Sequence, residues 1–212
     1  MMFLKYDSDF NFIFTKIADL FILNILFILC SLPIFTIGAS YTALYECVTS
    51  LKDDSTTSLV KDFFKTFKSK FKYSFIAQLA IIILTIILWS NFLIILSLST
   101  AIKFAFIVIL ALYFIVLASF VVYIYPIICR YDMKFIDLLR VTFAIAIKNP
   151  LNTLSLIIIN FLPLIIMLVL PIFDIYIILF MTFLGFSLIS FLSSILLEKI
   201  FKTTSITLVN SR

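Results

Sequence analysis

The stretch LVKDFFKTFKSKFKYSF, residues 59–75, carries the densest charge in a chain that is otherwise mostly hydrocarbon. On a helical wheel of about 100° per residue, its apolar side chains gather on one side and its lysines on another. This pattern predicts an amphipathic helix in the headgroup region, with lysines reaching anionic lipid phosphates and phenyl rings entering the acyl boundary. The basic side consists of Lys61, Lys65, Lys68 and Lys72, and the apolar side of Val60, Phe63, Phe64, Phe67, Phe71 and Phe75.

The composition around this stretch predicts a membrane protein. Of the 212 residues, 64% are hydrophobic and the mean hydropathy is +1.27, whereas a soluble domain is only about 45–50% apolar. Several apolar runs approach the roughly 20 residues that cross a hydrocarbon core, and none alternates with the period of two that barrel strands show. We therefore expect an all-α fold, a polytopic transmembrane helical bundle that forms one integral membrane domain over residues 1–212.

The apolar runs and the charged segments between them predict the order of elements. Residues 1–16 are expected to form an interfacial lead-in and residues 203–212 a polar tail. Pro33, near the end of the first run, should kink or break its helix. The five predicted spans cover residues 17–37, 73–96, 101–128, 150–170 and 175–197, and the three predicted amphipathic helices cover residues 39–51, 58–72 and 132–148.

Lysines and arginines in short connections bias a loop toward the cytoplasm, and they predict the orientation. With residues 52–72 inside, five spans place thirteen of the sixteen basic residues on the cytoplasmic side, including Arg140 and Lys148 of the second charged helix. The C-terminus is then cytoplasmic and the N-terminus outside. An alternative stays open at Pro33, because a re-entrant first run would move the N-terminus inside and leave everything later as assigned. The five-span arrangement leaves three basic residues outside, namely Lys5, Lys16 and Lys103.

Three polar side chains, Asn24, Gln78 and Asn160, fall inside the predicted spans. Side chains of this type often form hydrogen bonds between helices, which favours a structural role over a substrate pathway. No acidic or basic residue sits securely at the middle of the membrane, which argues against a proton-coupled pump or a voltage sensor.

The sequence offers little to an enzyme or a metal site. Histidine is absent, and Cys30, Cys47 and Cys129 lack the CxxC spacing of zinc sites. We predict no catalytic residue, metal or cofactor. The net charge of +5 lies beside the spans rather than in a separate basic domain. Anionic lipid headgroups, rather than nucleic acid, are therefore the expected counter-charge.

The segments ADLFILN (18–24), LPIFTIGASYTALY (32–45), FFKTFKSKFKYSF (63–75) and AIAIKNPLNT (144–153) resemble the YesL-like family of bacterial integral membrane proteins. The most specific motif contains Pro33, Gly38, Ala39 and Ser40, and its small residues allow close backbone approach. The resemblance implies the bacterial plasma membrane, an uncharacterised molecular activity and an association with carbohydrate-uptake loci.

Three functional hypotheses follow. The first is a non-enzymatic accessory to a carbohydrate-uptake or related membrane complex, which docks through its charged helices onto ABC transporter subunits or associates with itself. The second is a small transporter or channel that uses the three intramembrane polar residues and the proline kinks. The third, a lipid-modifying enzyme, is the weakest because no histidine, metal cluster or carboxylate pair presents itself.

Overall fold

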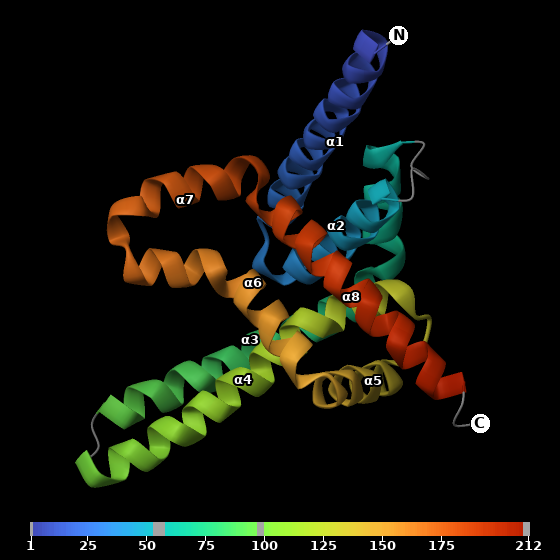
Figure 1. Cartoon of the computed structure of the whole chain (residues 1–212). Coiled ribbons are helices and arrows are strands. Elements are labelled where there is room, and N and C mark those ends of the chain that lie inside the picture. Colours follow the sequence, from blue (N-terminus) through green and yellow to red (C-terminus); the bar gives the residue numbers. More distant parts are fainter. Residues whose placement is uncertain (1, 53–57, 97–99, 210–212) are drawn as a thin grey trace.

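The computed structural model describes residues 2–52, 58–96 and 100–209, and every regular element in those ranges is helical. The predicted all-α class is therefore confirmed (Figure 1). Two short 3-10 turns, η1 (Ile34–Thr36) and η2 (Pro171–Phe173), and a π-helical turn, η3 (Met181–Gly185), interrupt the α-helices. The α-helices are α1 (Met2–Cys30), α2 (Ile37–Lys52), α3 (Leu59–Leu96), α4 (Thr100–Arg130), α5 (Phe135–Lys148), α6 (Pro150–Val169), α7 (Asp174–Phe180) and α8 (Phe186–Val209).

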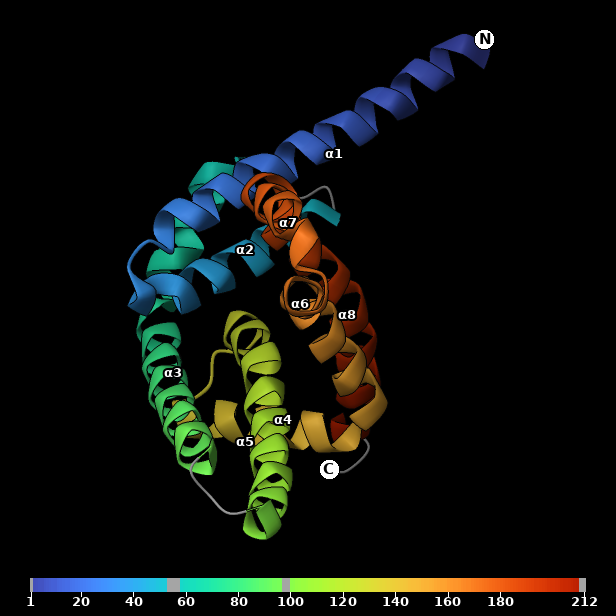
Figure 2. The same ribbon diagram turned by 90° about the vertical axis from the view of Figure 1, so that its left-hand side faces the viewer.

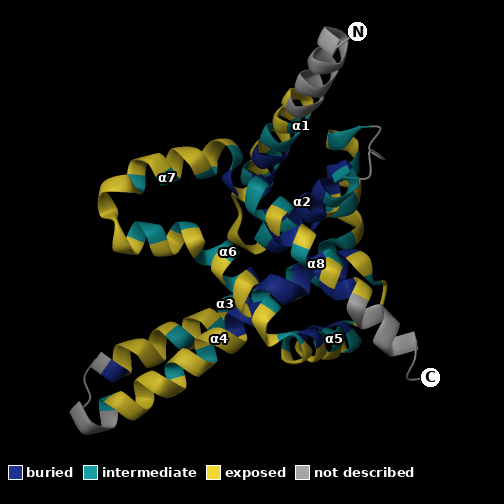
Figure 3. Cartoon of the chain, viewed as in Figure 1, coloured by how far each residue is buried: buried dark blue, intermediate teal, exposed yellow. Residues whose placement is uncertain are grey.

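Four helical segments in the described part of the chain are long and apolar enough to cross a bilayer: Leu59–Ile95, Lys103–Arg130, Pro150–Val169 and Pro171–Lys202. The hairpins α3–α4 and α6–α7 project from the region around α2 (Figure 1). Most of their length is exposed (yellow in Figure 3), and many of the exposed residues are large and apolar. Exposed apolar area of this extent calls for a hydrocarbon solvent rather than water. The chain is a membrane protein.

The first span was predicted to cover residues 17–37 with a kink or break at Pro33, and the helix does break near that residue. α1 ends at Cys30, and Pro33 adopts an extended backbone with φ −77° and ψ 122°. Proline has no N–H to continue the helix, so the chain turns there. The Thr36 hydroxyl donates to the carbonyl oxygens of Cys30 at 2.6 Å and Pro33 at 2.7 Å, which stabilises the turn.

The chain then returns along α2, antiparallel to α1 (Figure 2). At the base of this hairpin, the Lys16 ammonium of α1 donates to the carbonyl oxygen of Leu51 near the end of α2. The structure therefore has the hairpin that the sequence left as an alternative. Lys16, which the five-span arrangement placed opposite the other basic residues, lies beside Lys52.

α2 is the central helix, and it packs against α1, α3, α4 and α8. Gly38, Ala39 and Ser40 are all buried in these contacts. A Cβ added at Gly38 would lie 2.6 Å from Cε1 of Tyr125 in α4 and 2.8 Å from the backbone oxygen of Ser74 in α3. Gly38 thus allows three helices to approach more closely than any other residue would.

The predicted amphipathic helix 58–72 and the predicted span 73–96 form a single helix, α3, of 38 residues. At 1.5 Å per residue it is about 57 Å long, well beyond a hydrocarbon core of about 30 Å. Its phenyl face does not simply enter lipid: Phe63 is fully buried, in a cluster with Leu23 of α1 and Val48 of α2. The prediction that the phenyl rings enter the acyl boundary is therefore wrong for Phe63, because the α1–α2 hairpin covers it.

The other predicted elements can be matched to observed helices, with smaller differences in where most of them begin and end. The predicted helices 39–51 and 132–148 correspond to α2 and α5, and the span 150–170 corresponds to α6. The last predicted span is divided between α7, η3 and α8, and α8 continues to Val209 through most of the predicted tail. The predicted lead-in is the beginning of α1, and Lys5 lies outside the residues whose side chains are described.

Replacing Gly38 by alanine should lower the unfolding temperature in detergent. Its new methyl group would press on the Ser74 backbone, and overpacking of this kind costs about 1–3 kcal/mol. Gly185→Ala is the matched control, because the three atoms nearest to its new methyl group all belong to the flexible side chain of Met181. Alanine also favours a helix over glycine by about 1 kcal/mol. A Gly38→Ala melting curve equal to or above that of Gly185→Ala would contradict the tight crossing.

Candidate functional site

A pocket of about 500 Å³ lies between α1, α2, α3, α4, α6 and the η3–α8 segment. We call it the central pocket. Most of its lining is apolar, from side chains such as Phe161, Met167 and Phe186. Its polar lining residues are Tyr41, Gln78, Tyr125 and Asn160, which come from four different helices.

Gln78 lies on α3 with only 7% of its surface exposed. The Tyr125 hydroxyl of α4 donates a hydrogen bond to the Gln78 amide oxygen. Within the described part of the chain, the amide nitrogen of Gln78 has no partner. The side chain therefore has unused hydrogen-bond donors next to the central pocket.

Asn160 on α6 is fully engaged. Its amide nitrogen donates to the carbonyl oxygen of Leu156 at 2.9 Å and to the hydroxyl of Ser193 in α8 at 3.0 Å. Its amide oxygen accepts from the Tyr41 hydroxyl of α2 at 3.3 Å. Asn160 thus joins α2, α6 and α8 at one wall of the pocket.

Asn24, the third predicted polar residue, does not line the central pocket but completes η3 beside it. A π-helical turn disturbs the regular ladder of backbone hydrogen bonds. The Asn24 amide nitrogen donates to the carbonyl oxygens of Met181 at 2.9 Å and Thr182 at 2.8 Å. Its amide oxygen accepts from the backbone N–H of Ser187 at 3.1 Å. One side chain of α1 therefore satisfies three backbone groups of the last candidate span.

The basic residues gather where the ends of several helices meet, a region we call the basic end. Lys52 of α2 pairs with Glu198 of α8 at 3.1 Å. Arg130, at the end of α4, lies over the ring of Phe201 in α8, 4.9 Å from its centroid. These contacts join α2, α4 and α8.

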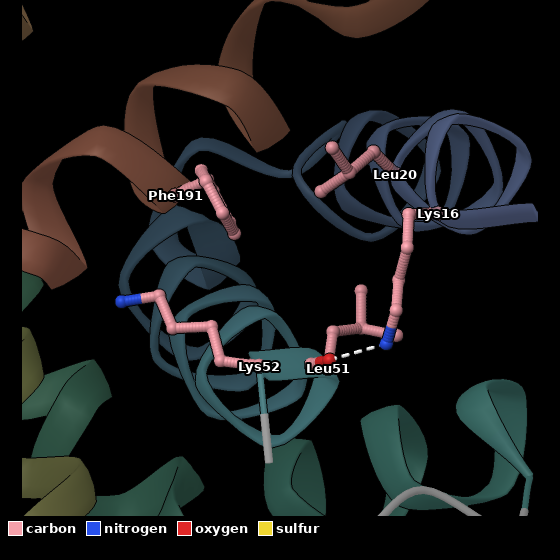
Figure 4. A pocket seen from close by; sticks show the side chains of 5 residues that line it. All are labelled: Lys16, Leu20, Leu51, Lys52 and Phe191. Carbon is pink, nitrogen blue, oxygen red and sulfur yellow. Dashed lines mark hydrogen bonds between the residues drawn. The ribbon is translucent and has the colours of Figure 1, made fainter. Parts of the chain in front are cut away.

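The base of the α1–α2 hairpin belongs to the basic end and contains a smaller pocket of about 330 Å³ (Figure 4). The carbonyl oxygen of Leu51, at the negative end of the α2 dipole, accepts from Lys16. The Lys52 ammonium lies 5.4 Å from the ring centroid of Phe191, with its tip directed away from Lys16. Leu20 completes the apolar wall.

The two predicted charged helices also meet at the basic end. Lys70 of α3 pairs with Asp132, just before α5, and the rings of Tyr73 and Phe135 stack 6.3 Å apart. Arg140 pairs with Asp137 on its own helix at 3.4 Å. The predicted surface cations are exposed to solvent or headgroups at Lys61, Lys65, Lys68, Lys72, Arg140 and Lys148.

Sequence reasoning identified Gln78 and Asn160 because amides stand out in apolar runs, but it missed their partners. In the sequence, Tyr41 and Tyr125 look like ordinary aromatic residues, because only the fold places their hydroxyls beside the amides. Their hydroxyls were the available signal, since a buried tyrosine usually needs a hydrogen-bond partner. In the ranges given above, histidine, cysteine, aspartate and glutamate side chains form no group of three or more suited to a metal ion.

The helices and their apolar surfaces define a multi-pass membrane protein, and one family model matches part of it. Residues 20–92 match the family described as "Protein of unknown function, DUF624". The matched part contains the last third of α1, all of α2 and most of α3, including Gly38 and Gln78. No curated protein and no solved structure matches the chain.

Replacing Asn24 by leucine should destabilise the protein by several kcal/mol. The change removes all three hydrogen bonds that Asn24 makes to the backbone around η3, and each such bond contributes about 0.5–1.5 kcal/mol. Asn91→Leu is the matched control, because exposed Asn91 bonds only to Ile87 of its own helix. Thermal unfolding in detergent measures the difference. Equal melting temperatures for the two variants would show that η3 does not depend on Asn24.

Proposed function

We propose that the protein is a non-enzymatic accessory subunit of a membrane complex for carbohydrate uptake, and that it docks through the basic end. The contact between the two charged helices carries this proposal. The Lys70–Asp132 pair and the Tyr73–Phe135 stack connect α3 to the beginning of α5, while lysines on both helices remain exposed. Such a surface suits acidic patches of a partner protein and anionic lipid headgroups.

The partner part of the proposal has two sources of support. Carbohydrate uptake comes from the resemblance to the YesL-like family, and it makes ABC transporter subunits the first partner to test. The exposed apolar sides of the α3–α4 and α6–α7 hairpins offer contact area within the bilayer. Self-association through the same hairpins is the alternative partner arrangement.

The proposed orientation differs from the five-span arrangement at the N-terminus. The α1–α2 hairpin returns the chain to the side from which it came, since Lys16 contacts Leu51. Four spans then follow, so the two termini lie on the same side. With the basic end in the cytoplasm, as the positive-inside rule requires, both termini are cytoplasmic in the bacterial plasma membrane.

Reporter fusions test this orientation. Green fluorescent protein should fluoresce when fused to either terminus, and alkaline phosphatase should be inactive at both. The same phosphatase inserted at Lys103, at the far end of the α3–α4 hairpin, should be active and serves as the control. An active phosphatase at the N-terminus would restore α1 as a full span.

Co-purification from mild detergent tests docking. The tagged protein should recover transporter subunits, and the change of Lys61, Lys65, Lys68 and Lys72 to glutamine should reduce recovery at least fivefold by removing the exposed charge. Lys103→Gln is the control, because this lysine lies away from the basic end. Failure to recover any subunit, together with normal sugar uptake in a deletion strain, would refute the accessory role.

A further inference from the structure

Gln78 has hydrogen-bond donors that nothing in the described structure uses. Its side chain is more than nine-tenths buried and lines the central pocket. Its amide oxygen is engaged by Tyr125, but its amide nitrogen has no partner in the ranges that the structure describes. Gln78 lines the pocket, so this donor is available there to a ligand or to ordered water, the usual partners of polar groups that the protein leaves unpaired.

The other polar groups of the pocket limit the kind of ligand that Gln78 can bind. Both ends of the Asn160 amide are taken, and the hydroxyls of Tyr41 and Tyr125 already donate to Asn160 and Gln78. The free donors of the polar lining therefore belong to one amide. A sugar carries many hydroxyl groups that would each need a partner. Beside that one amide, the lining offers only the remaining oxygen lone pairs of four side chains, too few to satisfy them all on an otherwise apolar wall.

Charge excludes another class of ligand. The described lining contains no lysine, arginine, aspartate or glutamate. A carboxylate or phosphate placed among Phe161, Met167 and Phe186 would lose its hydration without gaining a counter-charge. The ligand must then be uncharged, with a hydrocarbon body and an acceptor oxygen at one point.

The position and size of the pocket fit a lipid. It lies among α3, α4 and α6, three of the helices long enough to cross the bilayer. Its volume of about 500 Å³ falls within the range of roughly 300–1,000 Å³ for small-molecule sites. Met167 and Met181 are flexible side chains that adapt to a hydrocarbon chain of variable shape.

We infer that the central pocket binds the acyl chain of an uncharged lipid ester, whose carbonyl oxygen accepts a hydrogen bond from the Gln78 amide nitrogen. This site is separate from the basic end and does not depend on the proposed docking role. Because the Gln78 amide donates a hydrogen bond, an ester should bind more tightly than a plain hydrocarbon. Because the lining carries no charge, the ester should also bind more tightly than a fatty acid anion.

Photo-crosslinking tests the site directly. The full-length protein in mild detergent is labelled with a long-chain monoacylglycerol that carries a diazirine in its acyl chain. Labelled peptides, identified by mass spectrometry, should come from the pocket wall around Phe161 and Met167 of α6. Unlabelled monoacylglycerol should compete, and the matching free fatty acid should compete at least tenfold less well. Labelling spread evenly over lipid-facing helices would overturn the proposal.

A paired comparison isolates Gln78. Tyr125→Phe serves as the reference, because it removes the tyrosine hydroxyl that would otherwise be freed by a change at Gln78. Adding Gln78→Leu to this reference should weaken labelling by the ester about tenfold, the effect of losing one buried hydrogen bond. Asn91→Leu in the same background controls for losing an amide elsewhere on α3.

The ligand supplies a second comparison that does not depend on how stable each variant is. A monoalkylglycerol ether has the same chain and head but no carbonyl group. The reference protein should prefer the ester over the ether about tenfold, and the Gln78→Leu variant should show no preference. An equal response to ester and ether in the reference protein, or an unchanged preference in the variant, would refute the proposed hydrogen bond.

Discussion

The close approach of three helices at Gly38 is the contact on which the rest of the structure depends. The absence of a side chain there lets α2 lie directly against the Ser74 backbone of α3 and the Tyr125 ring of α4. Lipid tails are as apolar as leucine side chains, so burial of apolar area gives little drive for helices to associate inside a bilayer. Packing distance and hydrogen bonds must supply it instead. Gly38 provides the short packing distance. On the same helix, the Tyr41 hydroxyl provides a hydrogen bond to Asn160 of α6.

Buried amides join further helices to one another and to α2. Asn24 attaches α1 to the η3 turn, and Asn160 joins α2, α6 and α8. These bonds tie together helices that are far apart in the sequence. Gln78 differs from the other two amides, because its hydrogen bonding is incomplete within the described chain. Two of the amides hold the helices in place, and the third is available to a ligand.

Hydropathy was sufficient to predict the all-α class and the long apolar runs that form most of α3, α4 and α6. Hydropathy alone could not predict the α1–α2 hairpin, which the sequence indicated only as an alternative through Pro33. Hydropathy counts the turn at Pro33 as part of the same run, and only the packing of α2 shows that the chain reverses. The helical wheel of residues 59–75 separated lysines from phenylalanines, but it could not distinguish lipid from protein as the surroundings of Phe63. Lipid tails and the protein interior are both apolar, so a phenylalanine that faces either one gives the same hydrophobic pattern in the sequence. The sequence showed the amides as polar residues within apolar runs. Their tyrosine partners could not be identified in this way, because the pairing depends on contacts between helices that are far apart in the sequence.

The η3 turn also sets the rotational register of the last helix. Each residue of an α-helix advances the side-chain direction by about 100°, and a π-helical turn accommodates one residue outside that regular count. After η3, the hydroxyl-bearing residues Ser187, Ser190 and Ser194 are fully buried against the protein. Removing a single residue from this turn would rotate all of α8 relative to α7. The serines would then turn away from the face on which they are buried, and the Lys52–Glu198 pair, halfway along α8, would lose its alignment. A local irregularity near the central pocket therefore determines which residues reach the basic end.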